Sequence, residues 1–87
     1  MPRTAPPTSE QDQRILGEAL RALRREAGLT QEQLADRLGV DPTFVGRLER
    51  GQRGAHWRTI RRILTALDIP VSTFAAAIET AERQARA

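Results

Sequence analysis

The chain has 87 residues and a mass of 9.7 kDa, which is enough for one small domain with a modest hydrophobic core. It contains no Cys and a single His, which excludes a disulfide framework and a thiolate zinc site. Hydrophobic residues make up 39% and charged residues 29%, as in ordinary globular proteins. No apolar run approaches the ~18 residues of a membrane span, and the N-terminus lacks the apolar segment of a secretory signal. We therefore expect a cytoplasmic protein with no membrane partner.

The positive charge is concentrated in one part of the chain. All 14 basic residues are Arg, and six of them lie between residues 47 and 62 with a single acid, Glu49. That stretch has a net charge of +5, whereas residues 1–46 and residues 63–87 each have a net charge of −1. A local excess of this size points to a polyanion such as nucleic acid, although a solvated helix face rich in Arg would look the same.

The chain is expected to begin with a disordered leader and a long helix. Residues 1–9 hold three Pro, two Thr and one Ser, and little that can pack. Apolar residues then recur at helical spacing, which predicts a helix over residues 10–27 that ends at Gly28. Its expected buried stripe consists of Ile15, Leu16, Ala19, Leu20, Leu23 and Ala27.

A short second helix is predicted to start at Thr30. Thr30 and Gln33 have the spacing of a capping box, in which each side chain accepts from a free backbone N–H. Gly39 ends this helix, because a residue without Cβ suits a left-handed turn. The expected buried face consists of Leu34, Ala35 and Leu38.

A third helix is predicted from the pair Asp41 and Pro42. The carboxylate of Asp41 can accept from free N–H groups, and Pro at the first helical position gives up a donor that had no partner. The helix runs to about Arg50, and Gly51 closes it. Its expected buried side consists of Val45 and Leu48.

Two more helices are predicted after a loop at residues 51–55. The start of the fourth helix is not fixed, because His56 is a poor N-cap, and the helix ends before Pro70. Ser72 is the expected cap of a fifth helix that runs toward the C-terminus. The stripe expected to be buried on the fourth helix consists of Trp57, Ile60, Ile63, Leu64 and Leu67.

The most informative unit covers residues 31–50, where two helices of about eight residues are joined by a turn containing Gly39. This is the spacing of a helix-turn-helix, whose second helix enters the major groove of DNA. Over residues 15–74 the chain resembles the Cro/C1-type (XRE) family of phage-repressor-like DNA-binding domains. The motifs that carry the resemblance are LRREAG at 23–28, LTQEQLA at 29–35, LGV at 38–40, FV at 44–45, LERG at 48–51 and ALDI at 66–69.

The resemblance implies a compact all-α domain of five helices with a central helix-turn-helix, similar to lambda repressor. It also implies that the protein binds operator double-stranded DNA as a homodimer and regulates transcription. The corresponding division of the chain is a leader at 1–9, a helix-turn-helix domain at 10–78 and, at 79–87, the end of the fifth helix as a dimerisation extension.

The resemblance also assigns DNA contacts to individual residues. Arg47 is expected to bond to guanine O6 and N7, and Phe44 to contact a thymine methyl group unless it folds back over Val40. Gln31 lies at a helix N-terminus, which favours phosphate. Base readout is expected from Pro42, Thr43, Phe44 and Arg47. Phosphate contacts are expected from Gln31, Arg50, Gln52, Arg53 and Arg58.

Three positions depart from the family pattern or from helix preference. Pro42 stands where a polar reader is common, and it can touch a base only with its ring. Asp68 replaces a common Gly, and we expect it to tolerate a left-handed cap. Gly46 weakens its helix by up to ~1 kcal/mol relative to Ala, which a close approach to the DNA backbone or to the preceding helix would offset.

Several other residues are expected to be structural. The resemblance implies a partly buried ion pair between Arg24 and Glu49. Trp57 is expected in the core, and His56 in an exposed loop or beside a phosphate, because the sequence offers no second His or Cys to complete a metal site. No catalytic, metal-binding or cofactor-binding residue is expected.

The last helix carries a seam of apolar residues at 3-4-3-4 spacing, formed by Val71, Phe74, Ile78, Ala81 and Ala85. One interpretation is a dimer interface, with Val71, Phe74 and Ile78 as candidates. The other is that these three residues close the domain's own core while the chain frays from Ala81 onward.

The leading functional prediction is a sequence-specific, double-stranded DNA-binding transcriptional regulator, most simply a repressor. The alternative is an antitoxin-like or other protein-interaction module that binds a protein partner and autoregulates by DNA binding. Membrane-surface binding through the amphipathic first helix ranks lower. An enzyme ranks lowest, because the sequence contains no carboxylate pair, Gly-rich phosphate loop or metal cluster.

Overall fold

The computed structural model describes residues 9–87, and within that range the secondary structure is entirely helical. The prediction of an all-α, five-helix fold is therefore confirmed. The leader predicted at 1–9 lies outside the described residues except for Ser9, with which the first helix begins. The helices are α1 (Ser9–Glu26), α2 (Gln31–Leu38), α3 (Pro42–Glu49), α4 (Trp57–Leu67) and α5 (Val71–Arg86).

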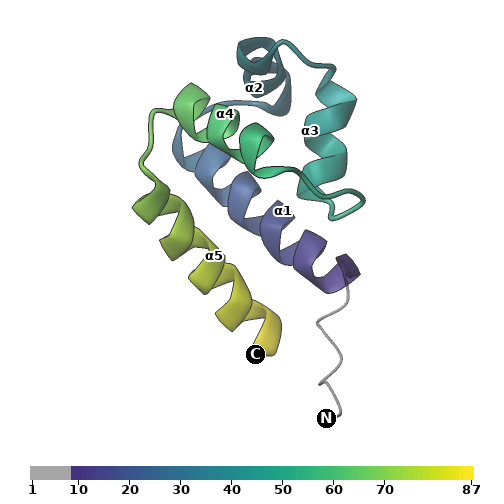
Figure 1. Ribbon diagram of the computed structural model, residues 1–87, viewed down its shortest axis with the longest axis vertical. Coiled ribbons are helices and arrows are strands. Elements are labelled where there is room, and N and C mark those ends of the chain that lie inside the picture. Colours follow the sequence, from purple (N-terminus) through teal and green to yellow (C-terminus); the bar gives the residue numbers. More distant parts are fainter. Residues whose placement is uncertain (1–8) are drawn as a thin grey trace.

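Helix α1 lies at the centre of the domain. It packs against α5 along one side and against α3 on the other, while α2 contacts both α3 and α4 (Figure 1). Leu34, Leu48 and Ile63, from α2, α3 and α4, are the largest fully buried side chains. They meet Leu20 and Leu23 of α1 in one hydrophobic cluster. Because this cluster contains residues of four helices, it fixes the orientation of α3 relative to α1, α2 and α4.

The predicted capping signals of α2 and α3 are confirmed. Gln33 N donates to Thr30 Oγ1 at 3.1 Å, and Thr30 N donates to Gln33 Oε1 at 2.9 Å, which completes the capping box. Gly39 closes α2 with φ of 69°. Asp41 Oδ1 accepts from Thr43 N at 2.8 Å, with Pro42 as the first helical residue. The two helices of the central unit thus begin and end where their local sequence predicts.

The ends of α4 and α5 contain one confirmed and one wrong prediction. Asp68 adopts the left-handed conformation (φ 56°) that was expected of it as the α4 C-cap. The prediction that Ser72 caps α5 is wrong, because α5 begins at Val71 with Pro70 in the N-cap position. Pro70 already has the extended backbone of an N-cap (ψ 164°), so the helix starts directly after it without a side-chain cap.

Gly17 allows α1 and α3 to approach closely, and this role was not predicted from the sequence. A Cβ at this position would overlap the carbonyl oxygen of Leu48 and lie 2.7 Å from that of Glu49. Both are backbone atoms in the last turn of α3, which cannot move without moving the helix. The absence of a side chain at Gly17 therefore sets the separation between the two helices.

Helix α5 is continuous to Arg86, and it packs on α1 along much of its length (Figure 1). Ala81 is its one buried residue, at 7% exposure, so the expectation that the chain frays from Ala81 onward is wrong. Phe74 packs against the core cluster and Ile78 is half-buried. Val71, at the start of the helix, is 52% exposed. The seam thus faces the domain's own core in part and leaves Val71 uncovered.

Among the described residues, no single helix is long and apolar enough to cross a membrane. Helices α4 and α5 pass that test of length and composition only as a pair, and they are bent by 108° at the break between them.

Candidate nucleic-acid interface

Helix α3 presents one polar side to solvent and buries the other. Val45 and Leu48 are each 2% exposed and belong to the core cluster, as predicted. Pro42, Thr43 and Arg47 are exposed. Three of the four residues predicted to read bases therefore share an open face on a helix whose opposite side is anchored.

The start of this exposed face is fixed by Asp41. Its carboxylate accepts the Thr43 N–H, and this hydrogen bond lowers the pKa of Asp41 below its ordinary value. The charge of Arg47, nearly two helical turns further on, acts in the same direction as a smaller cause. The hydrogen bond from Thr43 N to Asp41 holds the first turn of α3 in place.

Phe44 differs from the other three predicted readers. It is half-buried and packs against the core cluster. The guanidinium of Arg53 lies over its ring, with Cζ 4.4 Å from the ring centroid. This is the geometry of a cation–π contact, worth about 0.5–1 kcal/mol at an exposed site. Phe44 thus links α3 to the loop that follows it.

Gly46 is buried beneath the side chain of Arg50. A Cβ at this position would lie 2.9 Å from Arg50 Nη1. The neighbour of Gly46 is therefore an Arg of the following turn, and no atom of α2 is among the three nearest to that site. Arg50 Nε and Nη2 both lie 3.3 Å from Gln52 Oε1, to which they donate. The missing side chain at Gly46 lets the Arg50 guanidinium lie along α3.

The predicted ion pair between Arg24 and Glu49 is confirmed. Arg24 Nε and Nη2 donate to the two carboxylate oxygens at 2.6 and 2.9 Å, and both residues are buried, at 7% and 4% exposure. Arg24 Nη1 also donates to the Leu29 carbonyl at 2.7 Å. The hydrogen bonds and charge of Glu49 raise the pKa of Arg24 above its ordinary value. The pair ties α1 to the last turn of α3.

Gln31 joins the same network from the start of α2. Its Nε2 donates to Glu49 Oε1 at 3.0 Å, and the residue is half-buried. A residue expected to contact phosphate is therefore positioned by a carboxylate in the last turn of α3. The sequence offered the residue types for this contact, but no spacing rule connects two residues 18 positions apart.

Helix α4 differs from prediction at its first residue. Ile60, Ile63, Leu64 and Leu67 are buried as predicted, but Trp57 is 52% exposed, so its assignment to the core is wrong. The buried stripe begins at Ile60, one turn after Trp57. His56 is exposed and gives no side-chain cap. The neighbouring Arg58 is exposed as well.

The predicted phosphate-contacting residues are therefore spread over three elements. Gln31 lies on α2, Arg50 to Arg53 follow α3, and Arg58 lies in the first turn of α4. The four residues that follow α3 or begin α4 are exposed, namely Arg50, Gln52, Arg53 and Arg58.

Among residues 9–87 no group of three His, Cys, Asp or Glu side chains could hold a metal ion.

This fold and this face define the class of DNA-binding helix-turn-helix domains. Residues 15–77 match the family model described as "Helix-turn-helix domain". The chain belongs to this family, and its relatives are XRE-type helix-turn-helix regulators rather than enzymes, as predicted.

Two curated relatives are named as regulators of transcription. The chain is 47% identical over 55 residues to the HTH-type transcriptional repressor RghR of Bacillus subtilis, covering 62% of this chain and 41% of RghR. It is 34% identical over 61 residues to the HTH-type transcriptional regulator SutR of Escherichia coli, covering 70% of this chain and 34% of SutR. The chain thus spans between about a third and two fifths of the length of these relatives.

One solved structure is matched over almost its whole length. The restriction-modification controller protein C.AhdI of Aeromonas hydrophila is 42% identical and superposes with a TM-score of 0.68, and the match covers 74% of this chain and 97% of C.AhdI. The clp gene regulator ClgR of Corynebacterium glutamicum is 27% identical, with a TM-score of 0.78 over 92% of this chain. The predicted lambda-repressor-like fold is thereby confirmed.

Proposed function

We propose that the protein is a sequence-specific, double-stranded DNA-binding regulator of transcription that reads the major groove with residues 42–50. The observation that carries this proposal is the division of α3 into an open face and an anchored face. Thr43 and Arg47 are exposed, while Val45 and Glu49 are fixed in the core and in the ion-pair network. A rigid helix with an outward Arg can enter the major groove and bond to guanine O6 and N7.

Phosphate contacts on both sides of that helix would set its register without reading sequence. We assign them to Gln31 at the start of α2 and to Arg50, Gln52, Arg53 and Arg58 beyond α3. The free donors at the α2 N-terminus and the positive end of its dipole support the first assignment. The exposure of the other four residues supports the second.

Phe44 supports recognition in a different way from that predicted. Its half-buried ring leaves only an edge for a thymine methyl group, while its face is covered by Arg53. We therefore assign Phe44 first to positioning Arg53 and second to apolar contact with a base. Pro42 remains at the exposed start of α3, where its ring can touch a base.

The protein is proposed to act as a cytoplasmic homodimer and as a repressor. Helix-turn-helix dimers place two recognition helices ~34–36 Å apart, one turn of DNA. The exposed Val71, beside the half-buried Phe74 and Ile78, provides an apolar surface for a second copy. The relative RghR is named a repressor, which supports this sign of regulation.

Selection of binding sites from a random duplex library tests the proposal. We expect an enriched site composed of two inverted half-sites about 10 base pairs apart, because two symmetric subunits recognise symmetric DNA. Enrichment of a single half-site would refute the dimer and leave DNA reading intact. A library that remains random after selection would refute sequence-specific binding altogether.

A further inference from the structure

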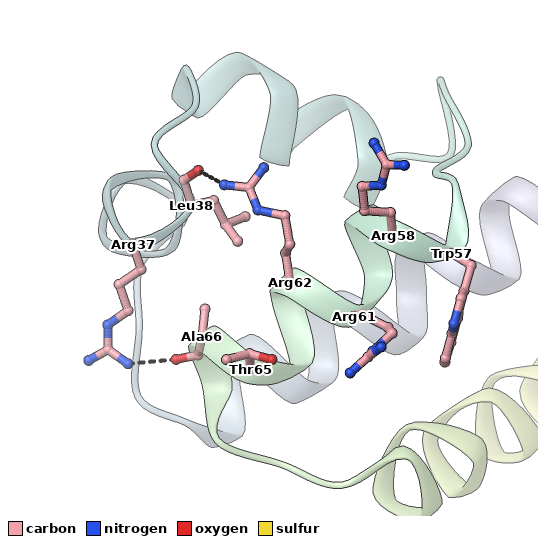
Figure 2. Close-up of a pocket in the computed structure, with 8 residues that line it drawn as sticks. All are labelled: Arg37, Leu38, Trp57, Arg58, Arg61, Arg62, Thr65 and Ala66. Atoms are coloured by element: carbon pink, nitrogen blue, oxygen red, sulfur yellow. Dashed lines mark hydrogen bonds between the residues drawn. The ribbon is translucent and has the colours of Figure 1, made fainter.

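The outer side of α4 carries a groove of about 720 Å³ that the proposed DNA contacts leave largely unexplained. It lies between α4 and the C-terminal end of α2, and Figure 2 shows the side chains around it. Four Arg line it, with Leu38 and Ala66 at one end and Trp57 at the other. No acidic residue lines it. We call these residues the α4 groove.

Two of the four Arg are held in place by the ends of the helices. Arg37 Nη1 donates to the Ala66 carbonyl at 2.9 Å, and Arg62 Nη2 donates to the Leu38 carbonyl at 2.6 Å (Figure 2). Each thereby caps the C-terminus of the other's helix. A guanidinium has five N–H donors, so both keep donors for a ligand. The positive wall of the α4 groove is consequently part of the folded structure.

The other two, Arg58 and Arg61, are exposed and make no hydrogen bond or ion pair with any residue between 9 and 87. Trp57 is 52% exposed, and its side chain extends from the same side of α4 as that of Arg61, whereas Arg58 extends from the opposite side (Figure 2). An exposed indole near an unpaired guanidinium group is a common composition for the centre of a protein–protein contact, where Trp and Arg are enriched. The combination offers an apolar platform together with charge.

We propose that the α4 groove binds an acidic segment of another protein, with a carboxylate on Arg61 and an apolar side chain against Trp57, while Arg58 on the opposite side of α4 stays assigned to the DNA backbone. Four Arg and no acid in the lining favour an acidic occupant through charge complementarity. Except for the buried Leu38 and the half-buried Ala66, the lining residues are exposed, so the α4 groove is shallow. A shallow groove suits a polypeptide segment, whereas a small ligand is usually enclosed. Residues 1–8 of this chain contain no acid and cannot supply the segment.

Trp57 is the only Trp of the chain, and the chain has no Tyr, so its fluorescence reports directly on the α4 groove. The full chain is titrated with a short peptide of alternating Glu and Leu, and in parallel with a peptide of alternating Gln and Leu. We expect a saturable change in Trp57 emission with the Glu peptide that weakens as salt is raised. An absent change, or an equal response to the Gln peptide, overturns the proposal.

Matched variants separate the α4 groove from general attraction between opposite charges. Arg61→Ala is expected to weaken the Glu peptide about fivefold, as for an exposed ion pair. Arg61→Lys should recover part of that loss. Arg86→Ala, which removes the same charge from the last turn of α5, should bind like the parent. Equal weakening in Arg61→Ala and Arg86→Ala would contradict a defined site.

The same variants distinguish this proposal from DNA binding. Arg61 is not among the proposed phosphate contacts, so Arg61→Ala should retain the affinity of the parent for the selected duplex. If Arg61→Ala weakens the duplex as much as the peptide, the α4 groove is part of the DNA-binding surface and the proposed protein partner is wrong. Peptide binding without any duplex selectivity would instead refute the DNA-binding proposal alone.

Discussion

Gln31 donates its amide hydrogen to Glu49 Oε1 at 3.0 Å, so the start of α2 is held by the end of the recognition helix. Arg24 donates to both oxygens of the same carboxylate from α1. Three helices therefore meet on one buried charge. Because the Gln31 amide nitrogen must face the carboxylate, its second N–H is left in a defined direction and can donate to a phosphate. This contact couples the proposed contact with the DNA backbone to the helix that is proposed to read the bases.

The first prediction concerns the stability that this network provides. Glu49→Ala should lower the free energy of unfolding by about 3–5 kcal/mol, because it leaves the buried guanidinium of Arg24 without its partner. Urea denaturation followed by circular dichroism measures the change. Glu79→Ala removes an acid from the exposed side of α5 and serves as the control, with an expected change within about 0.5 kcal/mol. A small loss in Glu49→Ala would mean that the pair contributes little to folding.

The second prediction concerns the crossing of α1 and α3. Gly17→Ala should cost about 1–3 kcal/mol, because the new methyl group overlaps backbone carbonyls of Leu48 and Glu49. It should also weaken duplex binding, since relief of the overlap requires α3 to move. Gly54→Ala is the matched control, because a Cβ at this position lies at an ordinary distance of 3.5 Å from Gln13. Thermal unfolding that does not distinguish the two variants would show that α3 is not held at this crossing.

The elements of the fold were predictable where local rules decide them. The capping box at Thr30, the Asp41 start and the left-handed Asp68 depend on residues within one helical turn, and all three were found as predicted. The buried stripe of α4 follows from its 3.6-residue period. These features need no knowledge of the neighbouring helices.

What the sequence missed depends on contacts between distant parts of the chain. Trp57 lies on the apolar stripe of α4, yet it is exposed. The prediction failed because the position of a residue on the stripe does not say whether another helix covers that turn. Gly17 has no local sign of its role, since only the crossing with α3 makes a Cβ impossible there. The contact of Arg53 with Phe44 likewise joins a loop to a helix. The predicted readers Thr43 and Arg47 were placed on an open face, but their contacts with bases stay a prediction.

The third prediction concerns acid sensitivity at the start of α3. Hydrogen bonding to Thr43 N lowers the pKa of Asp41, so the stabilisation is complete above the ordinary carboxyl value of about 4 and is lost as the pH falls through the lower folded value. Asp41→Asn keeps an N-cap that does not titrate. The stability advantage of the parent over this variant should therefore shrink between about pH 5 and pH 2.

Denaturation curves across that acid range test the effect of Asp41. Asp36→Asn, on the exposed side of α2, controls for the loss of an acid, and its difference from the parent should change less. A constant difference between the parent and Asp41→Asn would exclude the ionised cap.

The fourth prediction separates the proposed dimer surface on α5 from the part of α5 that packs on the core. Val71→Asp should convert the protein to a monomer that remains folded, because the Val71 side chain is half exposed and no helix covers it. Phe74→Ala should instead lower stability by about 3 kcal/mol or less, since its ring packs against the core only in part. Sedimentation velocity reports the oligomeric state and thermal unfolding the fold. A dimer that survives Val71→Asp places the subunit contact elsewhere on the surface.

The fifth prediction distinguishes reading of bases from contact with phosphates. Arg47→Ala should lose about 1–3 kcal/mol of discrimination between the selected duplex and a base-substituted one, because it removes the guanidinium that is proposed to bond to guanine. Arg50→Ala should weaken all duplexes alike and reduce the slope of log K against log salt by about one unit.

Fluorescence anisotropy at two or more salt concentrations measures both effects of these substitutions. The two positions are matched controls for each other, since both side chains are exposed Arg on adjacent turns around α3. The Arg50 guanidinium lies against Gly46, where a Cβ would come within 2.9 Å of Nη1, and this contact gives a further prediction. Gly46→Ala displaces that guanidinium and should shift uniform affinity, as Arg50→Ala does, while base preference is retained. If Arg50→Ala changes base preference and Arg47→Ala does not, the roles assigned to these two residues are wrong.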